Sequence, residues 1–319
     1  MLRHFVLLAI ASAAVAAEQQ VYELSGRLVP AMGARLSLFG STTPYSTSTL
    51  VDYSGRFRFK KLRPGLYTMA IFNRRRGEAR RTVEVGPALA DAKGRISIKL
   101  ELNDADFVFA SILKGNLVSA RQLAVPGTAL RDYREAQKDL GRRDSDAAAK
   151  RLEHAVELAP QFSAAWNSLG VIAYQTRKFD RAEECFRKAL DADPALFEAV
   201  VNLGGVALTV HQFDLAADYN LKAVLQRPND ALANAQLGMT YLSLGQLDLA
   251  LKYLEQARRI DPANMTYPQL SLFEIHLRRG ERDSAAADLE DFLHHHPDWA
   301  QAERMRQTID NLRAESGQR

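Results

Sequence analysis

The residues best suited to chemistry are three adjacent histidines and one cysteine. His294, His295 and His296 precede Pro297, and Cys185 is the only cysteine in the 319 residues. Adjacent positions on a helix point in different directions, so these histidines cannot close one metal site together. They suit the C-terminal end of a helix, where positive charge is favoured. No catalytic pattern surrounds Cys185, so we interpret it as a small side chain packed on a helix.

The familiar catalytic motifs are missing. The sequence has no His-Glu-x-x-His zinc pattern, no Gly-rich phosphate loop and no Gly-x-Ser-x-Gly nucleophile elbow. We therefore predict that the chain is not an enzyme and that it needs neither a cofactor nor a metal ion.

A cluster of arginines around Gly77 has chemistry of another kind. Guanidinium groups bind phosphate or carboxylate through paired hydrogen bonds, so we expect an anionic surface to contact this cluster. The alternative is an exposed turn that its charge keeps soluble. The arginines are Arg74, Arg75, Arg76, Arg80 and Arg81.

Charge is unevenly distributed along the chain. Residues 18–103 carry a net charge of +8, whereas residues 104–319 carry −5. This asymmetry favours a basic module that faces an anionic partner, such as a lipid headgroup, an acidic polymer or a protein face. A solvated basic surface is the alternative.

The first 17 residues are typical of an export signal. Arg3 precedes the apolar stretch Phe5–Ala17, which ends in small residues. A run of about a dozen apolar residues is too short to anchor in a bilayer. We therefore expect a cleaved signal over residues 1–17, a bacterial periplasmic location and no transmembrane segment; an uncleaved N-terminal helix is the alternative. An exported protein is not expected to bind nucleic acid.

The pattern over residues 18–103 has period two. Apolar side chains alternate with polar ones around Leu36, Phe57 and Ile96, as half-buried strands require. Glycine and proline separate the runs, and seven short strands at this spacing predict an antiparallel β-sandwich. Residues 104–127 are expected to end this domain and connect it to the next; within them, 107–113 and 116–123 are candidate further strands.

One segment of this domain, residues 52–67, is more specific. A glycine turn comes first, then two inward aromatic residues, a second turn and a third aromatic residue. These are Ser54-Gly55, Phe57, Phe59, Pro64-Gly65 and Tyr67. The segment resembles the carboxypeptidase regulatory-like domain, a small transthyretin-type sandwich. The resemblance implies an accessory fold without catalytic residues of its own.

After residue 127 the period becomes helical, and a longer repeat of 34 residues appears. Proline, alanine and aspartate each recur five times, with steps of 34, 34, 34 and 35 residues. The positions are Pro160, Pro194, Pro228, Pro262 and Pro297; Ala148, Ala182, Ala216, Ala250 and Ala285; and Asp146, Asp180, Asp214, Asp248 and Asp283. We expect each aspartate to cap a helix, each alanine to allow two helices to approach closely, and each proline to end a helix.

One copy carries Trp166, Leu169-Gly170, Ala182, Phe186 and Pro194. This pattern resembles the tetratricopeptide repeat, a helix–turn–helix unit. The resemblance implies a helical solenoid of five repeats over residues 128–298, with a capping helix and tail over 299–319. The third copy departs from the pattern, because Asn220 replaces a large apolar residue.

Tetratricopeptide arrays commonly bind protein segments in the groove lined by the first helix of each repeat. The corresponding positions here are mainly apolar and neutral, and they lack a cluster of Lys and Arg for a carboxylate. We therefore expect a groove for an apolar or mixed peptide or for a partner helix. The alternative for each residue is packing between repeats. The set is Tyr133, Asn167, Val171, Tyr174, Val201, Asn202, Leu208, Ala235, Met239, Leu242, Tyr267 and Leu270.

Three hypotheses for function follow. The first is an exported scaffold or adaptor that binds a protein through the groove. The second is an assembly factor that self-associates through its repeats. The third is a module that binds an envelope polymer or carbohydrate through the basic sandwich.

Overall fold

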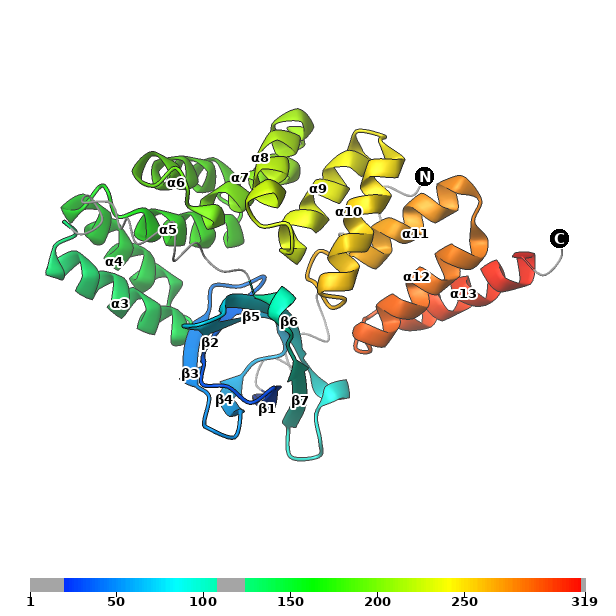
Figure 1. The fold of residues 1–319 in the computed structure, drawn as a ribbon, viewed down its shortest axis with the longest axis horizontal. Coiled ribbons are helices and arrows are strands. Elements are labelled where there is room, and N and C mark those ends of the chain that lie inside the picture. Colours follow the sequence, from blue (N-terminus) through cyan, green and yellow to red (C-terminus); the bar gives the residue numbers. More distant parts are fainter. Residues whose placement is uncertain (1–19, 108–123, 317–319) are drawn as a thin grey trace.

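The computed structural model describes residues 20–107 and 124–316, and Figure 1 shows their arrangement. A small β-domain comes first, and a curved array of helices follows it. The predicted export signal, residues 1–17, and both candidate further strands, apart from Phe107, lie outside the described residues. Residues 104–106, just before the first of these candidates, form a short 3-10 helix.

The β-domain is a sandwich of two sheets, as predicted. The three-stranded sheet has the order β4-β1-β7, and the four-stranded sheet has the order β3-β2-β5-β6. Neighbouring strands are antiparallel except β1 and β7, which are parallel. The strands are β1 Tyr22–Val29, β2 Arg35–Gly40, β3 Ser46–Leu50, β4 Arg56–Leu62, β5 Gly65–Asn73, β6 Gly77–Val85 and β7 Arg95–Glu101.

The alternation read from the sequence places one face of each sheet in a shared core. Leu36, Phe57 and Ile96 are buried there, as is Tyr67, whose hydroxyl donates to the carbonyl oxygen of Arg63. The glycine turn before β4 is required by its backbone, because Gly55 has a φ of 82°. The carboxypeptidase regulatory-like identity of this sandwich remains a prediction.

The helical part consists of five antiparallel helix pairs and one further helix among the described residues. The pairs are α3 Gly127–Gly141 with α4 Ser145–Leu158, α5 Ser163–Gln175 with α6 Phe179–Ala192, α7 Phe197–Thr209 with α8 Phe213–Gln226, α9 Ala231–Ser243 with α10 Leu247–Ile260, and α11 Pro268–Arg279 with α12 Arg282–His295. The capping helix is α13, Ala302–Ser316. Ile309 and Leu312 of α13 are buried against α12, as a cap requires.

The repeated alanines and prolines act as predicted. All five alanines of the series that begins at Ala148 have no exposed surface, because the two helices of each pair meet there. Each second helix ends two residues before its proline, for example at Leu158 before Pro160. A residue that precedes proline is disfavoured in helical conformation, which explains this constant distance.

The expected role of the repeated aspartates is wrong. Asp180 and its equivalents occupy the second position of the helix, not the cap, and α6, α8, α10 and α12 have no side-chain cap hydrogen bond. In α4 the cap is Asp144, which accepts a hydrogen bond from the backbone N–H of Ala147. The repeated carboxylates instead place negative charge in the first turn, where the helix dipole favours it.

Helix pairing also explains why glycine recurs in the first helices. A Cβ atom added to Gly170 would lie 2.4 Å from the ring of Phe186. In the third repeat the corresponding contact is polar, since a Cβ on Gly204 would lie 1.9 Å from Oδ1 of Asn220. Asn220 is fully buried, and its Oδ1 has no hydrogen-bond partner among the described residues.

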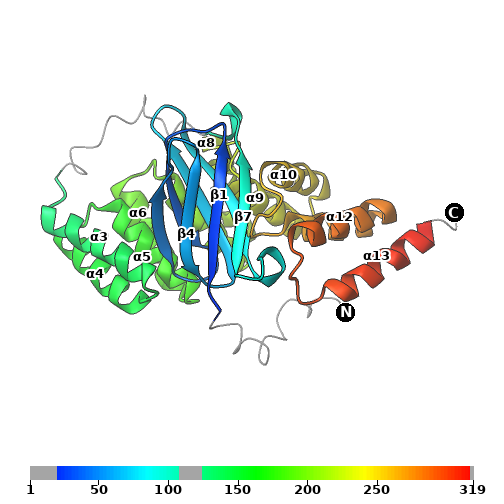
Figure 2. The same cartoon turned by 90° about the horizontal axis from the view of Figure 1, so that it is seen from below.

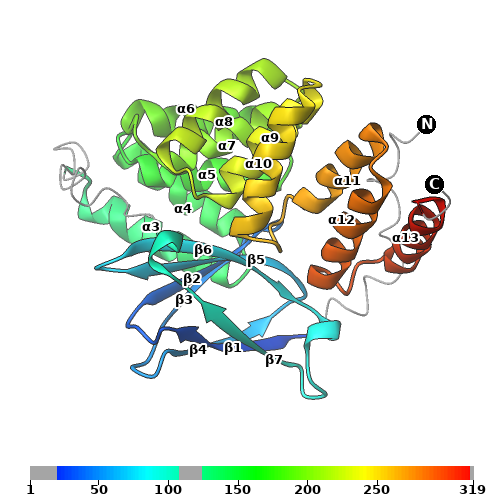
Figure 3. The ribbon, with the colours of Figure 1, turned by 45° about the vertical axis from the view of Figure 1, so that its right-hand side comes forward.

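The sandwich lies inside the curve of the solenoid. Figure 1 shows the helices arching over it, and Figure 3 shows the sheet β3-β2-β5-β6 between the helices and the other sheet. We call β3-β2-β5-β6 the inner sheet and β4-β1-β7 the outer sheet. The outer sheet faces away from the helices (Figure 2).

Candidate functional site

A groove with a volume of about 1330 Å³ lies on the concave side of the solenoid. First helices of successive repeats line it, mostly through the C-terminal halves of α5, α7 and α9. Six residues predicted from the sequence meet here: Val171, Tyr174, Asn202, Leu208, Met239 and Leu242. All six are partly exposed. Ser271, Glu274 and Arg278 of α11 also line the cavity, so the groove is a continuous surface to which four repeats contribute.

The other predicted groove residues lie elsewhere. Val201 and Ala235 are buried between helices, which is the packing alternative. Tyr133 packs against Phe162 at a ring distance of 5.0 Å. Tyr267 joins an aromatic cluster near the C-terminal end, and Leu270 packs beside α12.

Asn167, the remaining predicted residue, lies beside the groove and is linked to it. Its Oδ1 accepts a hydrogen bond of 3.1 Å from Nδ2 of Asn202.

Sequence reasoning predicted Asn202 but missed Gln236 and Ser271, which continue a line of polar side chains along the groove. Asn202, Gln236 and Ser271 all line the cavity. Each comes directly before a leucine, which begins a Leu-Gly pair in the third and fourth repeats and a Leu-Phe pair in the fifth. Their spacing of 34 and 35 residues could have identified them. Oε1 of Gln236 is buried without a hydrogen-bond partner among the described residues. The groove therefore combines apolar walls with amide groups that can bond a polypeptide backbone.

The sandwich closes one side of this groove. Ser41, in the loop between β2 and β3, lines the cavity. Gln175, at the end of α5, donates from Nε2 to the carbonyl oxygen of Gly40 over 3.0 Å. The open part of the groove is thus bounded by both domains.

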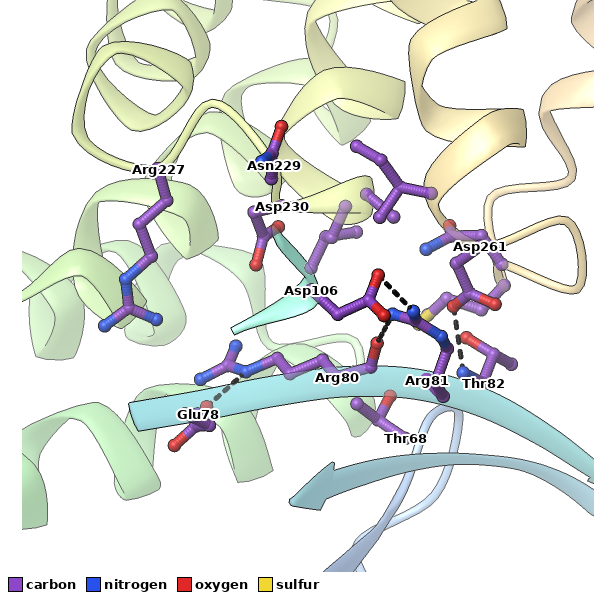
Figure 4. Close-up of a pocket in the computed structure, with 15 residues that line it drawn as sticks. Thr68, Glu78, Arg80, Arg81, Thr82, Asp106, Arg227, Asn229, Asp230 and Asp261 are labelled. Carbon is purple, nitrogen blue, oxygen red and sulfur yellow. Dashed lines mark hydrogen bonds and ion pairs between the residues drawn. The ribbon is translucent and has the colours of Figure 1, made fainter. Parts of the chain in front are cut away.

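A second, small cavity of about 60 Å³ lies where the inner sheet meets the solenoid (Figure 4). Arg80 of β6 donates to Oε1 of Glu78 over 2.6 Å and to Oε1 of Glu198 over 2.8 Å. Arg227 donates to the same Glu198 oxygen over 3.2 Å, and its guanidinium lies 4.0 Å from the ring centroid of Phe197. One glutamate of α7 therefore joins two arginines from different domains.

The pKa values of two solenoid carboxyls at this interface, Asp261 and Glu198, are shifted in opposite directions. Burial raises the pKa of Asp261, and the hydrogen bond from the backbone N–H of Thr82, 2.8 Å long, only partly opposes that effect. Burial also acts to raise the pKa of Glu198, but the charges of Arg80 and Arg227 outweigh it and lower the pKa overall. The two arginines therefore stabilise Glu198 as an anion, whereas ionisation of the buried Asp261 costs free energy in the folded protein.

Successive residues along β6 contact successive positions along the solenoid. On β6, Arg80, Thr82 and Glu84 are two residues apart and point to the same side of the sheet. They meet Glu198, Asp261 and His296, which lie progressively further along the solenoid. Beyond the strand, the backbone N–H of Ala88 donates to the carboxylate of Asp298. Since β6 is the last strand of its sheet, the solenoid also covers a sheet edge.

The predicted arginine cluster divides between this interface and the surface. Arg80 has the carboxylate partners described above, and Arg81 pairs with Asp106 over 2.7 Å. Arg76 lies 3.3 Å from Asp104 and near the ring of Phe107. Only Arg74 and Arg75 of the five are exposed, at the tip of the hairpin. Carboxylates of the same chain thus engage three members of the cluster.

One of the three adjacent histidines, His296, and the cysteine are buried inside the fold. His296 is 2% exposed, and its Nδ1 lies 3.0 Å from Oε2 of Glu84. Cys185 is fully buried, and burial raises the pKa of its thiol. Within residues 20–107 and 124–316, no three His, Cys, Asp or Glu side chains gather as a metal site would require. None of the helices in this part of the chain is long and apolar enough to cross a membrane.

Models of the tetratricopeptide repeat match residues 130–197 and 231–264. No curated protein matches the sequence. Among solved structures, PilW, a widely conserved type IV pilus biogenesis factor, is 20% identical with a TM-score of 0.50, over 60% of this chain and 92% of its own.

Two further solved structures are similar. MamA from Desulfovibrio magneticus RS-1, from residue 41 to its end, is 22% identical with a TM-score of 0.49, over 56% of this chain and 99% of its own. YrrB, a TPR protein with an unusual peptide-binding site, is 23% identical with a TM-score of 0.47, over 59% of this chain and 98% of its own. Together with the helix pairs and their 34-residue register, the family matches identify the helical part of this chain as a solenoid of tetratricopeptide repeats.

Proposed function

We propose that this chain is an exported, non-catalytic scaffold that binds an extended segment of another protein in the groove. The observation that carries the proposal is the 1330 Å³ cavity lined by apolar side chains and uncharged amides. Pockets for small molecules usually measure about 300–1,000 Å³, so this groove better suits a polypeptide.

The lining determines the kind of segment. Met239, Leu242 and Leu208 offer apolar contacts, while Gln236 and Asn202 offer hydrogen bonds to backbone groups. An apolar or mixed sequence in extended form satisfies both sets, because its backbone pairs with the amides and its side chains pack on the walls. An acidic chain terminus is not favoured, since of the lining residues only Arg278 carries a permanent positive charge.

Peptide display on the whole protein tests the proposal. We expect selected peptides to be rich in apolar residues and poor in acidic ones. The substitutions Met239→Glu and Leu242→Glu together should weaken binding of these peptides at least about tenfold, because they place two carboxylates against apolar side chains. Circular dichroism would verify that the variant folds.

The matched control is Leu221→Glu with Leu225→Glu, on the exposed side of α8. It adds the same charge outside the groove and should leave peptide binding unchanged. Affinity capture from a cell-envelope extract extends the test to natural partners. A set of captured partners that is identical for the groove variant and the parent would contradict the proposal. Capture of the chain's own copies, with association in solution, would favour the assembly factor instead.

A further inference from the structure

The outer sheet lies on the side of the sandwich opposite the solenoid (Figure 2), and most of its exposed side chains are basic. Ten side chains of β1, β4 and β7 alternate with the core residues and point outward. Six are basic, two are serine and two are acidic, and the partly buried Val29 follows them as the one apolar residue on this side of β1. We call this set the basic face: Glu23, Ser25, Arg27, Arg56, Arg58, Lys60, Arg95, Ser97, Lys99 and Glu101.

Strand register places three cations in one row across the basic face. Arg27 lies opposite Arg56 in the antiparallel pair and opposite Lys99 in the parallel pair. Like charges directly opposite one another destabilise a sheet. A surface that served only solubility would intersperse positive and negative charges. This row of like charges therefore lowers the stability of the sheet for a reason other than solubility.

The cations on this face are available to a ligand. Arg27 and Lys60 have no carboxylate partner among the described residues, and Arg27 donates instead to the carbonyl oxygen of Ser54. The other four cations are held in exposed ion pairs, Arg56 with Asp52, Arg58 with Glu23, Arg95 with Asp91 and Lys99 with Glu101, and each basic side chain is more than half exposed. Exposed pairs of this kind contribute little stability and exchange readily for another anion.

An aromatic residue stands at the end of the same row. Arg27 and Arg56 both bond to Ser54, in the turn before β4. The neighbouring Tyr53 is fully exposed, and Leu50, at the end of β3, is 71% exposed. Tyrosine combines an apolar ring with a polar hydroxyl and is enriched where water meets lipid.

We propose that the basic face binds the surface of an anionic phospholipid bilayer. An extended array of cations complements the array of phosphates on a bilayer, and no residue of this face lines the groove or the interface cavity described above. Tyr53 and Leu50 would enter the headgroup region beside Arg56. The docked inner sheet stays on the opposite side, so the interface with the solenoid does not compete with the membrane. This inference is independent of the peptide groove.

Sedimentation of the whole protein with vesicles tests the proposal. We expect binding to vesicles that contain phosphatidylglycerol, little binding to pure phosphatidylcholine, and weaker binding as salt rises. Each basic residue near an anionic bilayer contributes about fivefold to binding, so Arg27→Ser, Arg56→Ser and Lys99→Ser together should weaken it about a hundredfold. The melting temperature of this triple variant should be maintained, because the substitutions remove a row of like charges.

The matched control is Arg35→Ser, Arg74→Ser and Arg75→Ser, which removes the same charge from the inner sheet and its hairpin. We expect this variant to lose less than about tenfold in vesicle binding. An equal loss in both variants would show that net charge alone, not the basic face, controls binding. Equal binding to both kinds of vesicle, or binding to soluble heparin without binding to vesicles, would overturn the proposal, the latter in favour of a polymer.

Discussion

Glu198 allows a direct measurement of how strongly the sandwich is docked on the solenoid. Its Oε1 is 2.8 Å from Nη2 of Arg80, and both side chains are 30% exposed. Hydrogen bonds to charged groups contribute about 1.5–3 kcal/mol, and partial exposure places this pair near the lower end. We therefore expect a coupling energy of about 1.5 kcal/mol in a double-mutant cycle of Arg80→Ala and Glu198→Ala.

Denaturant unfolding followed by tryptophan fluorescence suits this cycle. Both tryptophans, Trp166 and Trp299, belong to the helical part, so the signal reports on the solenoid and not on the sandwich. Arg227 also loses a partner when Glu198 is replaced, but that loss is present in the single and the double variant and cancels. A coupling therefore appears in the solenoid signal only if the sandwich stabilises the solenoid.

The matched control is the pair Arg187–Glu183 on α6, which lies within the solenoid and whose arginine is more exposed than Arg80. Its coupling should stay below about 0.5 kcal/mol. If the Arg80–Glu198 cycle were additive within the same limit, the interface would not hold the domains together in solution, and the reasoning would be refuted.

Two further substitutions test buried polar groups. Asn220→Leu should raise the free energy of unfolding by about 1 kcal/mol, because it removes an unpaired buried oxygen where the fourth repeat has Leu254. It also removes the hydrogen bond from Nδ2 of Asn220 to Thr240, whose hydroxyl still donates to the carbonyl oxygen of Gln236. A decrease in the free energy of unfolding measured with denaturant would contradict this. Asp261→Asn should maintain or raise the melting temperature at pH 7, since the amide oxygen still accepts from Thr82, whereas Asp261→Ala should cost about 1–3 kcal/mol. Because the pKa of Asp261 is raised, the folded protein binds more protons, and any advantage of Asp261→Asn should shrink as pH falls through that pKa. Calorimetry at several pH values checks this, and equal losses in the Asn and Ala variants would contradict it.

The repeat architecture could be predicted because helix contacts recur in the sequence. Ala182 and Pro194 keep one register through five copies, since each repeat solves the same packing problem. The groove was predicted less accurately. On a helix, adjacent residues differ in direction by about 100°, so Asn202 lines the groove while its neighbour Val201 is buried. A position error of one residue therefore exchanges a binding residue for a core residue.

The docking of the sandwich left no signal of its own in the sequence. Arg80, Thr82 and Glu84 of β6 alternate with core residues, and so do Arg56 and Arg58 of β4. The first set meets the solenoid and the second faces solvent, yet both have the pattern of a half-exposed strand. Only the partner surface distinguishes them, because a polar side chain can bond to water or to a carboxylate equally well.

Docking changes the physical character of the solenoid. In a simple repeat array each unit contacts only its neighbours, so the array bends easily and its ends unfold independently. Here the sandwich contacts the first repeat through Arg143 and Tyr67, the third through Glu198, and the segment between α12 and α13 through Asp298. These contacts join positions far apart along the array and restrain its curvature. When the shape of a groove is fixed before its ligand binds, less binding free energy is lost in ordering the groove. Such a groove binds segments of one geometry tightly and does not adapt to many geometries. The sandwich therefore shapes the groove of the solenoid, even though its own basic face points away from it.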